Sequence, residues 1–101
     1  MSTIYITFDS APQTFFYTLS NMLKLDQAKN VLEIACGAGK LIPQVLDLKA
    51  PDTFYYATDI SEEMINFSKI RLEKHFEKYE SKLSFEEWVK KQNLEFGVIN
   101  G

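Results

Sequence analysis

The sequence predicts an α/β fold in which a parallel β-sheet is flanked by helices. An apolar segment at residues 31–35 ends in a turn with two glycines, and an amphipathic helix pattern follows it. A second apolar segment at residues 54–58 ends beside an aspartate, and a long helix pattern follows it as well. Strands that alternate with helices in this way pair in parallel, because each helix carries the chain back to the start of the next strand.

The first expected elements are a helix and a buried strand. Ser10 is suited to cap a helix, Pro12 is tolerated in its first turn, and Gln13 takes the capping-box position. Apolar residues then recur at helical spacing, at Phe15, Phe16, Leu19, Met22 and Leu23. The segment Val31–Ala35 is short and mostly apolar, as expected of a strand buried on both faces.

A glycine turn and a second helix and strand come next. The turn is formed by Cys36–Gly39, and a helical apolar stripe follows it, made of Leu41, Ile42, Val45, Leu46 and Leu48. Pro43 is compatible with this helix if the helix begins near Lys40, because proline is tolerated in a first turn. The aromatic, β-prone segment Phe54–Thr58 is the second expected strand.

The last third of the chain predicts two helices and a third strand. Ser61 caps a long amphipathic helix whose main apolar stripe contains Ile65, Leu72, Phe76 and Tyr79. A capping box at residues 84–87 begins a short helix over Phe85–Lys91, and Leu94–Ile99 is the third strand. Right-handed crossovers then place the three strands in the spatial order 3-2-1.

Length and composition exclude several classes of protein. The 101 residues are expected to form a single domain, residues 1–101, with an ordinary hydrophobic content of 46%. The net charge of −3 argues against a basic nucleic-acid-binding surface. No secretory signal is recognised at the N-terminus, and no apolar segment approaches the roughly 20 residues of a membrane span. A single cysteine excludes an internal disulfide and fits a cytoplasmic or nuclear setting, and no metal site is expected without a Cys/His cluster.

Two motifs stand at the ends of the first two strands. The first is Glu33-Ile34-Ala35-Cys36-Gly37-Ala38-Gly39, and the second is Asp59-Ile60-Ser61-Glu62-Glu63-Met64. Glycines let a backbone approach a ligand closely, although they would also suit a tight strand-to-helix turn with no ligand. A carboxylate at the end of the second strand can accept two hydrogen bonds from a ribose diol. Together the motifs predict a site for an adenosine-containing cofactor at the carboxyl ends of the strands.

In these motifs the chain resembles the class I S-adenosylmethionine-dependent methyltransferases. The family's first motif is an acid followed by a Gly-x-Gly turn, and its second is an acid within an Asp-hydrophobic-Ser-Glu-Glu-Met segment. The resemblance implies a Rossmann-like fold, S-adenosyl-L-methionine as the cofactor, and methyl transfer to an acceptor that the sequence does not identify. It covers nearly the whole chain but only about the first half of the family's seven-stranded fold, so we expect an incomplete sheet and name no catalytic residue.

The resemblance also implies a set of cofactor-binding residues: Glu33, Ala35, Cys36, Gly37, Gly39, Asp59, Ile60 and Asn100. Asp59 would bind the ribose hydroxyls or cap the following helix, and Ile60 would flank the adenine or belong to the core. Glu33 would lie near the cofactor's amino group or bond loop amides, and Asn100 would accept from the adenine amino group or be an unengaged terminal residue. Packing explains Cys36 better than nucleophilic chemistry does.

Two other functions stay open at this point. A truncated, non-catalytic methyltransferase-like module would bind the cofactor or a partner and transfer nothing. The nucleotide-binding half of an NAD(P) oxidoreductase is disfavoured, because Ile42 stands where the third glycine of its motif would be. In each case the first strand, Val31–Ala35, is left at an open sheet edge, which predicts pairing with a second copy or with a partner chain.

Overall fold

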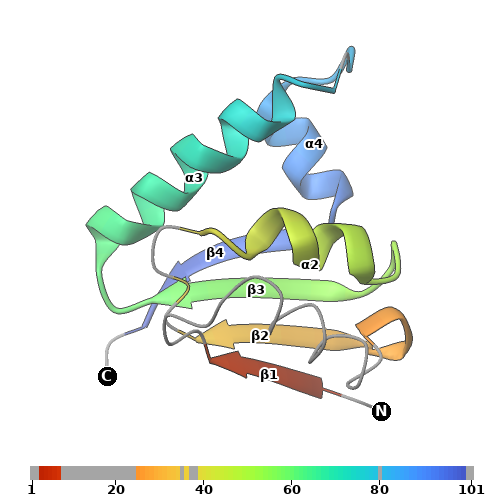
Figure 1. The fold of residues 1–101 in the computed structure, drawn as a ribbon, viewed down its shortest axis with the longest axis vertical. Helices are drawn as coiled ribbons and strands as arrows, with labels where there is room; N and C mark the ends of the chain where they lie inside the picture. Colours follow the sequence, from red (N-terminus) through yellow and green to blue (C-terminus); the bar gives the residue numbers. More distant parts are fainter. Residues whose placement is uncertain (1–2, 8–24, 35, 37–38, 80, 100–101) are drawn as a thin grey trace.

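The computed structural model describes residues 3–7, 25–34, 36, 39–79 and 81–99, and these form an α/β fold. Its centre is a four-stranded sheet, parallel throughout (Figure 1). In spatial order across the sheet, its strands are β1 (Thr3–Thr7), β2 (Asn30–Ile34), β3 (Phe54–Asp59) and β4 (Leu94–Val98). The three strands predicted from the sequence are therefore confirmed, with the predicted neighbours and with bounds that differ by one residue at most.

Strand β1 was not predicted, and it changes the edges of the sheet. It pairs in parallel with β2, with Ile6 opposite Glu33. The alternation of isoleucine with threonine and tyrosine over residues 3–7 is the signal that could have revealed it. The prediction that residues 31–35 lie at an open edge is wrong, because β1 occupies that edge. Among the described strands, the two open edges belong to β1 and β4.

The described ranges contain four helices, two of which begin at the serine caps predicted from the sequence. They are the 3-10 helix η1 (Leu25–Gln27) and the α-helices α2 (Ile42–Leu48), α3 (Glu62–Phe76) and α4 (Phe85–Lys91). Proline lies in the first turn of α2, as its prediction required. The Ser61 hydroxyl accepts a hydrogen bond from the Met64 N–H at 3.3 Å and caps α3. A capping box between Ser84 and Glu87 begins α4, so its predicted bounds are confirmed. The helix expected from Ser10 lies outside the described residues.

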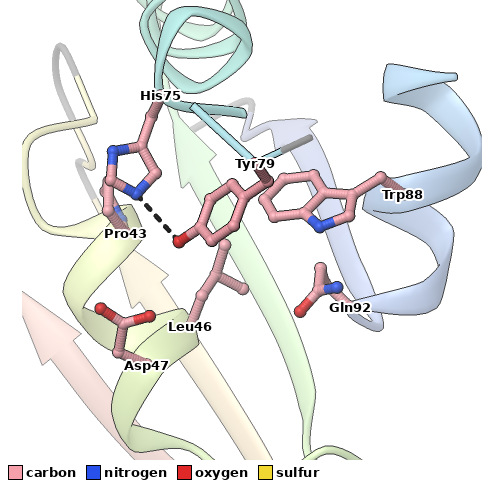
Figure 2. Close-up of a pocket in the computed structure, with 7 residues that line it drawn as sticks. All are labelled: Pro43, Leu46, Asp47, His75, Tyr79, Trp88 and Gln92. Atoms are coloured by element: carbon pink, nitrogen blue, oxygen red, sulfur yellow. Dashed lines mark hydrogen bonds between the residues drawn. The ribbon is translucent and has the colours of Figure 1, made fainter. Parts of the chain in front are cut away.

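Helix α3 is shorter than its apolar stripe suggested. It ends at Phe76, so Tyr79 lies beyond it, in the segment that leads to α4. There the Tyr79 ring packs against Trp88 of α4, with 5.8 Å between ring centroids, and its hydroxyl hydrogen-bonds His75 at 3.3 Å (Figure 2). Tyr79 therefore links the segment after α3 to α4, and it does not continue the apolar stripe of α3.

The three α-helices of the described ranges cover one face of the sheet (Figure 1). On that face the strand residues Ile6, Val31 and Tyr55 are each at most 3% exposed. On the opposite face Tyr5 is 63% exposed and Phe54 is 39% exposed. Right-handed crossovers explain this, because a sheet whose strand order runs in one direction receives all of its connections on one face. None of the helices in the described ranges is long and apolar enough to cross a membrane.

Candidate functional site

The carboxyl ends of β2 and β3 bring together the two sequence motifs. Glu33 pairs with Ala57 of β3, so Asp59 lies two residues, about 7 Å, further along the neighbouring strand. Beyond β2, the Cys36 N–H donates to the Thr58 carbonyl oxygen at 2.8 Å. This main-chain bond holds the first part of the glycine turn against the end of β3. The motifs are about twenty residues apart in the sequence but adjacent in the fold.

Glu33 is a buried carboxyl group inside the sheet. Its side chain is 0% exposed, and Oε1 accepts a hydrogen bond from the Tyr55 hydroxyl. Its other oxygen, Oε2, has no hydrogen-bond partner in the described structure. Burial raises the pKa of Glu33 from 4.5 to about 7, and the bond from Tyr55 opposes this only in part. A buried polar atom without a partner is costly, and a donor at Oε2 would stabilise the ionised form of Glu33 relative to the protonated form.

Two neighbours of Glu33 were missed by reasoning from the sequence. Tyr55 is 0% exposed, and burial together with the nearby Glu33 carboxyl raises its pKa well above 10. Thr58, also buried, donates from its hydroxyl to the Glu33 main-chain oxygen at 2.7 Å. Both belong to the β-prone run that identified the strand, where tyrosine and threonine signal only β-structure. Their polar atoms become informative only when the register across the sheet is known.

Asp59 lies at the end of β3 with its carboxylate mostly enclosed. The residue is 7% exposed, and Oδ1 accepts a hydrogen bond from the Ser61 N–H at 2.9 Å. The carboxylate thus supports the chain as it enters α3, while the N-cap itself is the Ser61 hydroxyl. The next residue, Ile60, is 77% exposed, which excludes the core position considered for it. An exposed apolar side chain beside a carboxylate suits a ligand with a flat apolar part and hydroxyl groups.

The last glycine of the turn has a structural requirement of its own. Gly39 has a φ of +77°, and a Cβ at this position would lie 2.9 Å from both the Cβ and the hydroxyl oxygen of Ser68. Backbone conformation and close packing against α3 therefore both require glycine here. From the sequence, the glycines would either let the backbone approach a ligand or form a tight strand-to-helix turn with no ligand. The structure supports a turn and packing role for Gly39, and the approach of a ligand stays a prediction.

Cys36, the first residue of the turn, packs against α3. It is 1% exposed, and its sulfur lies 3.8 Å from the Ser68 hydroxyl oxygen. Burial raises the pKa of the thiol to about 11, so the reactive thiolate is scarce near neutral pH. These observations support the packing role.

A family model described as a methyltransferase domain matches residues 25–96. The chain belongs to this family. The matched segment runs from η1 into β4 and contains Glu33, Cys36, Gly39 and Asp59, while β1 precedes it. Comparisons with curated proteins and with solved structures gave no significant match. The family assigns methyl transfer as the general chemistry of the domain.

Three of the predicted site residues cannot be placed in this methyltransferase domain. Ala35, Gly37 and Asn100 lie outside the described residues. Within the described part of the chain, no group of three or more His, Cys, Asp or Glu side chains is arranged to hold a metal ion.

A pocket of the methyltransferase domain lies between its described helices. It has a volume of about 200 Å³ (Figure 2). Its lining includes residues of α2 and α4, His75 near the end of α3, and Tyr79 in the segment that follows α3. Leu46, Tyr79 and Trp88 face it, and none of the predicted cofactor-binding residues does. This pocket is distinct from the site at the strand ends.

Proposed function

We propose that this chain is the cofactor-binding half of an S-adenosyl-L-methionine-dependent methyltransferase that acts on an acceptor of unknown class. The observation that carries the proposal is the hydrogen bond from the Cys36 N–H to the Thr58 carbonyl oxygen, with Asp59 as the next residue. It supports a single site in which a turn containing glycine faces a carboxylate across one strand boundary. Parallel α/β sheets bind nucleosides at this kind of position.

Asp59 and Ile60 would hold the nucleoside part of the cofactor. The Asp59 carboxylate would accept hydrogen bonds from the ribose diol, since Oδ1 already has a fixed direction through the Ser61 N–H. The exposed Ile60 side chain would cover one side of the adenine. The bound cofactor supplies an activated sulfonium methyl group, so the protein's main tasks are to orient the reactants and exclude water.

Glu33 offers the best test of whether the residues fit this cofactor. Its Oε2 is buried and has no partner in the described structure, while the neighbouring oxygen is held by Tyr55. A donor on the turn, or the cofactor's amino group through the turn or a water molecule, would satisfy this oxygen. The residues therefore fit a ligand with a positively charged amino group, and Glu33 would favour that charge once ionised.

Calorimetry with S-adenosylmethionine and with its demethylated product tests the proposal. Asp59→Asn keeps an oxygen to accept from the Ser61 N–H but removes the charge, so we expect both ligands to bind about tenfold more weakly or worse. Asp52→Asn is the matched control, because Asp52 is an exposed aspartate before β3 and should leave affinity unchanged. Equal affinity of the wild type and Asp59→Asn would remove the ribose role, and no binding to the wild type would remove the proposal.

A non-catalytic cofactor-binding module is the second candidate, and β1 is the observation that favours it. In the full family fold, the strand at the position of β2 would be central, with a later strand on its other side. Here β1 already pairs with β2 along that edge. A screen with radiolabelled S-adenosylmethionine and acceptor mixtures separates the candidates, because the module binds the donor and labels nothing.

A cytoplasmic or nuclear setting stays a prediction from the single cysteine.

A further inference from the structure

The outer edge of β4 presents a row of unused main-chain groups. Within the described sheet β4 pairs only with β3. The Tyr55 N–H donates to the Asn93 oxygen, and the Ile99 N–H donates to the Asp59 oxygen, each at 2.9 Å. In a parallel ladder this alternation directs the main-chain groups of residues 93, 95, 97 and 99 toward β3. Those of residues 94, 96 and 98 therefore point outward, away from the sheet.

An apolar groove of about 410 Å³ runs beside this edge. Its walls include Phe85 and Val89 of α4, and its floor includes Phe96. Both Glu95 and Phe96 line the groove. Consecutive side chains of a strand point to opposite faces of a sheet, so a groove that contacts both cannot lie on one face alone. The groove must therefore follow the outer edge of the strand. Helix α4 forms a wall along it, on the helix-covered face.

We propose that the edge of β4 binds an extended peptide segment of another protein by β-strand addition. Main-chain hydrogen bonds to residues 94, 96 and 98 would align the segment. Alternate apolar side chains of the segment would enter the groove against Phe85, Val89 and Phe96. Open strand edges are templates for this kind of pairing, and here the adjacent groove adds side-chain selectivity. This inference is independent of the proposed cofactor site.

Charge favours a peptide over a second copy of the chain. The Lys69 ammonium lies 5.7 Å from the centre of the Phe96 ring, at the groove. Antiparallel pairing of two β4 strands about a two-fold axis at Phe96 would bring both Lys69 ammonium groups together, which is repulsive. The rim carries two lysines and two glutamates, so its charges balance. A peptide that is apolar at alternate positions and has little net charge suits this surface.

Fluorescence anisotropy with a labelled heptapeptide in which valine alternates with threonine tests the proposal. We expect saturable binding to the wild-type chain. Two further peptides carry N-methyl groups on alternate amides, one on the odd positions and one on the even positions. Only one of these sets can donate to β4, so one peptide should lose about tenfold or more in affinity and the other should not. Equal binding of the two methylated peptides would overturn strand addition, and so would no binding of the parent peptide.

Substitutions in the protein locate the binding site. Val89→Glu places a charge on the groove wall and should weaken the parent peptide by about tenfold or more. Ile70→Glu is the matched control, because Ile70 is 56% exposed on α3 and does not line the groove. Amide NMR shifts on titration should concentrate at residues 94–98. Equal weakening by both substitutions, or self-association that Val89→Glu abolishes and the peptide does not affect, would overturn the peptide as the occupant. Because the methylated peptides leave the protein unaltered, they remain decisive if Val89→Glu fails to fold.

Discussion

Replacing Glu33 with glutamine should change how the stability of the fold depends on pH. Glu33 is fully buried, accepts one hydrogen bond from Tyr55 and has a pKa raised to about 7 by burial. The folded protein therefore holds a proton on this carboxyl group over a pH range in which the unfolded chain has released it. Glutamine has a similar shape but does not titrate, so it removes this difference while keeping an oxygen that can accept from Tyr55.

The sign and size of the effect follow from the two pKa values. Below pH 4.5 both states are protonated, and the contribution of Glu33 to stability is fully present. This contribution is lost as the pH rises from 4.5 to about 7, because the folded state binds more protons than the unfolded state in that interval. Above about pH 7 the effect of Glu33 on stability no longer changes with pH. The difference between these pKa values corresponds to about 3 kcal/mol. As the pH rises from 4.5 to 8, the free energy of unfolding of Glu33→Gln should therefore increase by about 3 kcal/mol relative to that of the wild type.

Urea unfolding followed by circular dichroism at several pH values measures this gain. Glu73→Gln provides the matched control, because Glu73 is an exposed residue of α3, and its profile should follow that of the wild type. Only the separation between the Glu33→Gln and wild-type curves is diagnostic, since other groups titrate equally in both proteins. If the two curves run parallel from pH 4.5 to pH 8, then Glu33 is not a protonated buried acid in the folded protein.

Three further outcomes are expected. Gly39→Ala should destabilise the fold by about 1–3 kcal/mol in urea unfolding, because it forces a Cβ into a positive-φ position 2.9 Å from Ser68; an unchanged midpoint would contradict this. Cys36 should resist a thiol reagent at pH 8 in the native protein and react fully in urea, and fast native modification would argue against its burial. The isolated chain should self-associate at micromolar concentration through the sheet face opposite the described helices, where Tyr5 and Phe54 are exposed; a single monomeric boundary in sedimentation velocity would refute this.

Local signals in the sequence predicted most of the elements. The Ser61 cap, the Ser84–Glu87 capping box and the tolerated Pro43 each act within one helical turn, so they can be read without knowledge of the fold. The positions of Glu33 and Asp59 near the ends of neighbouring strands also followed, because parallel connections leave strand ends on one edge. The same reasoning did not find β1, whose five residues have no cap or turn signal.

Tertiary structure alone decided the features that depend on distant neighbours. The pairing of β1 with β2, the hydroxyl of Tyr55 on the Glu33 carboxyl group, and the contact of Gly39 with Ser68 each join residues separated by more than twenty positions. Sheet register determines which side chains face one another, and a residue's own type does not specify its register. The sequence by itself determined the local conformations and the chemical groups available. The fold determined which carboxyl group is buried, which glycine is confined by packing and which strand edges stay open, because those properties arise from contacts between separate segments.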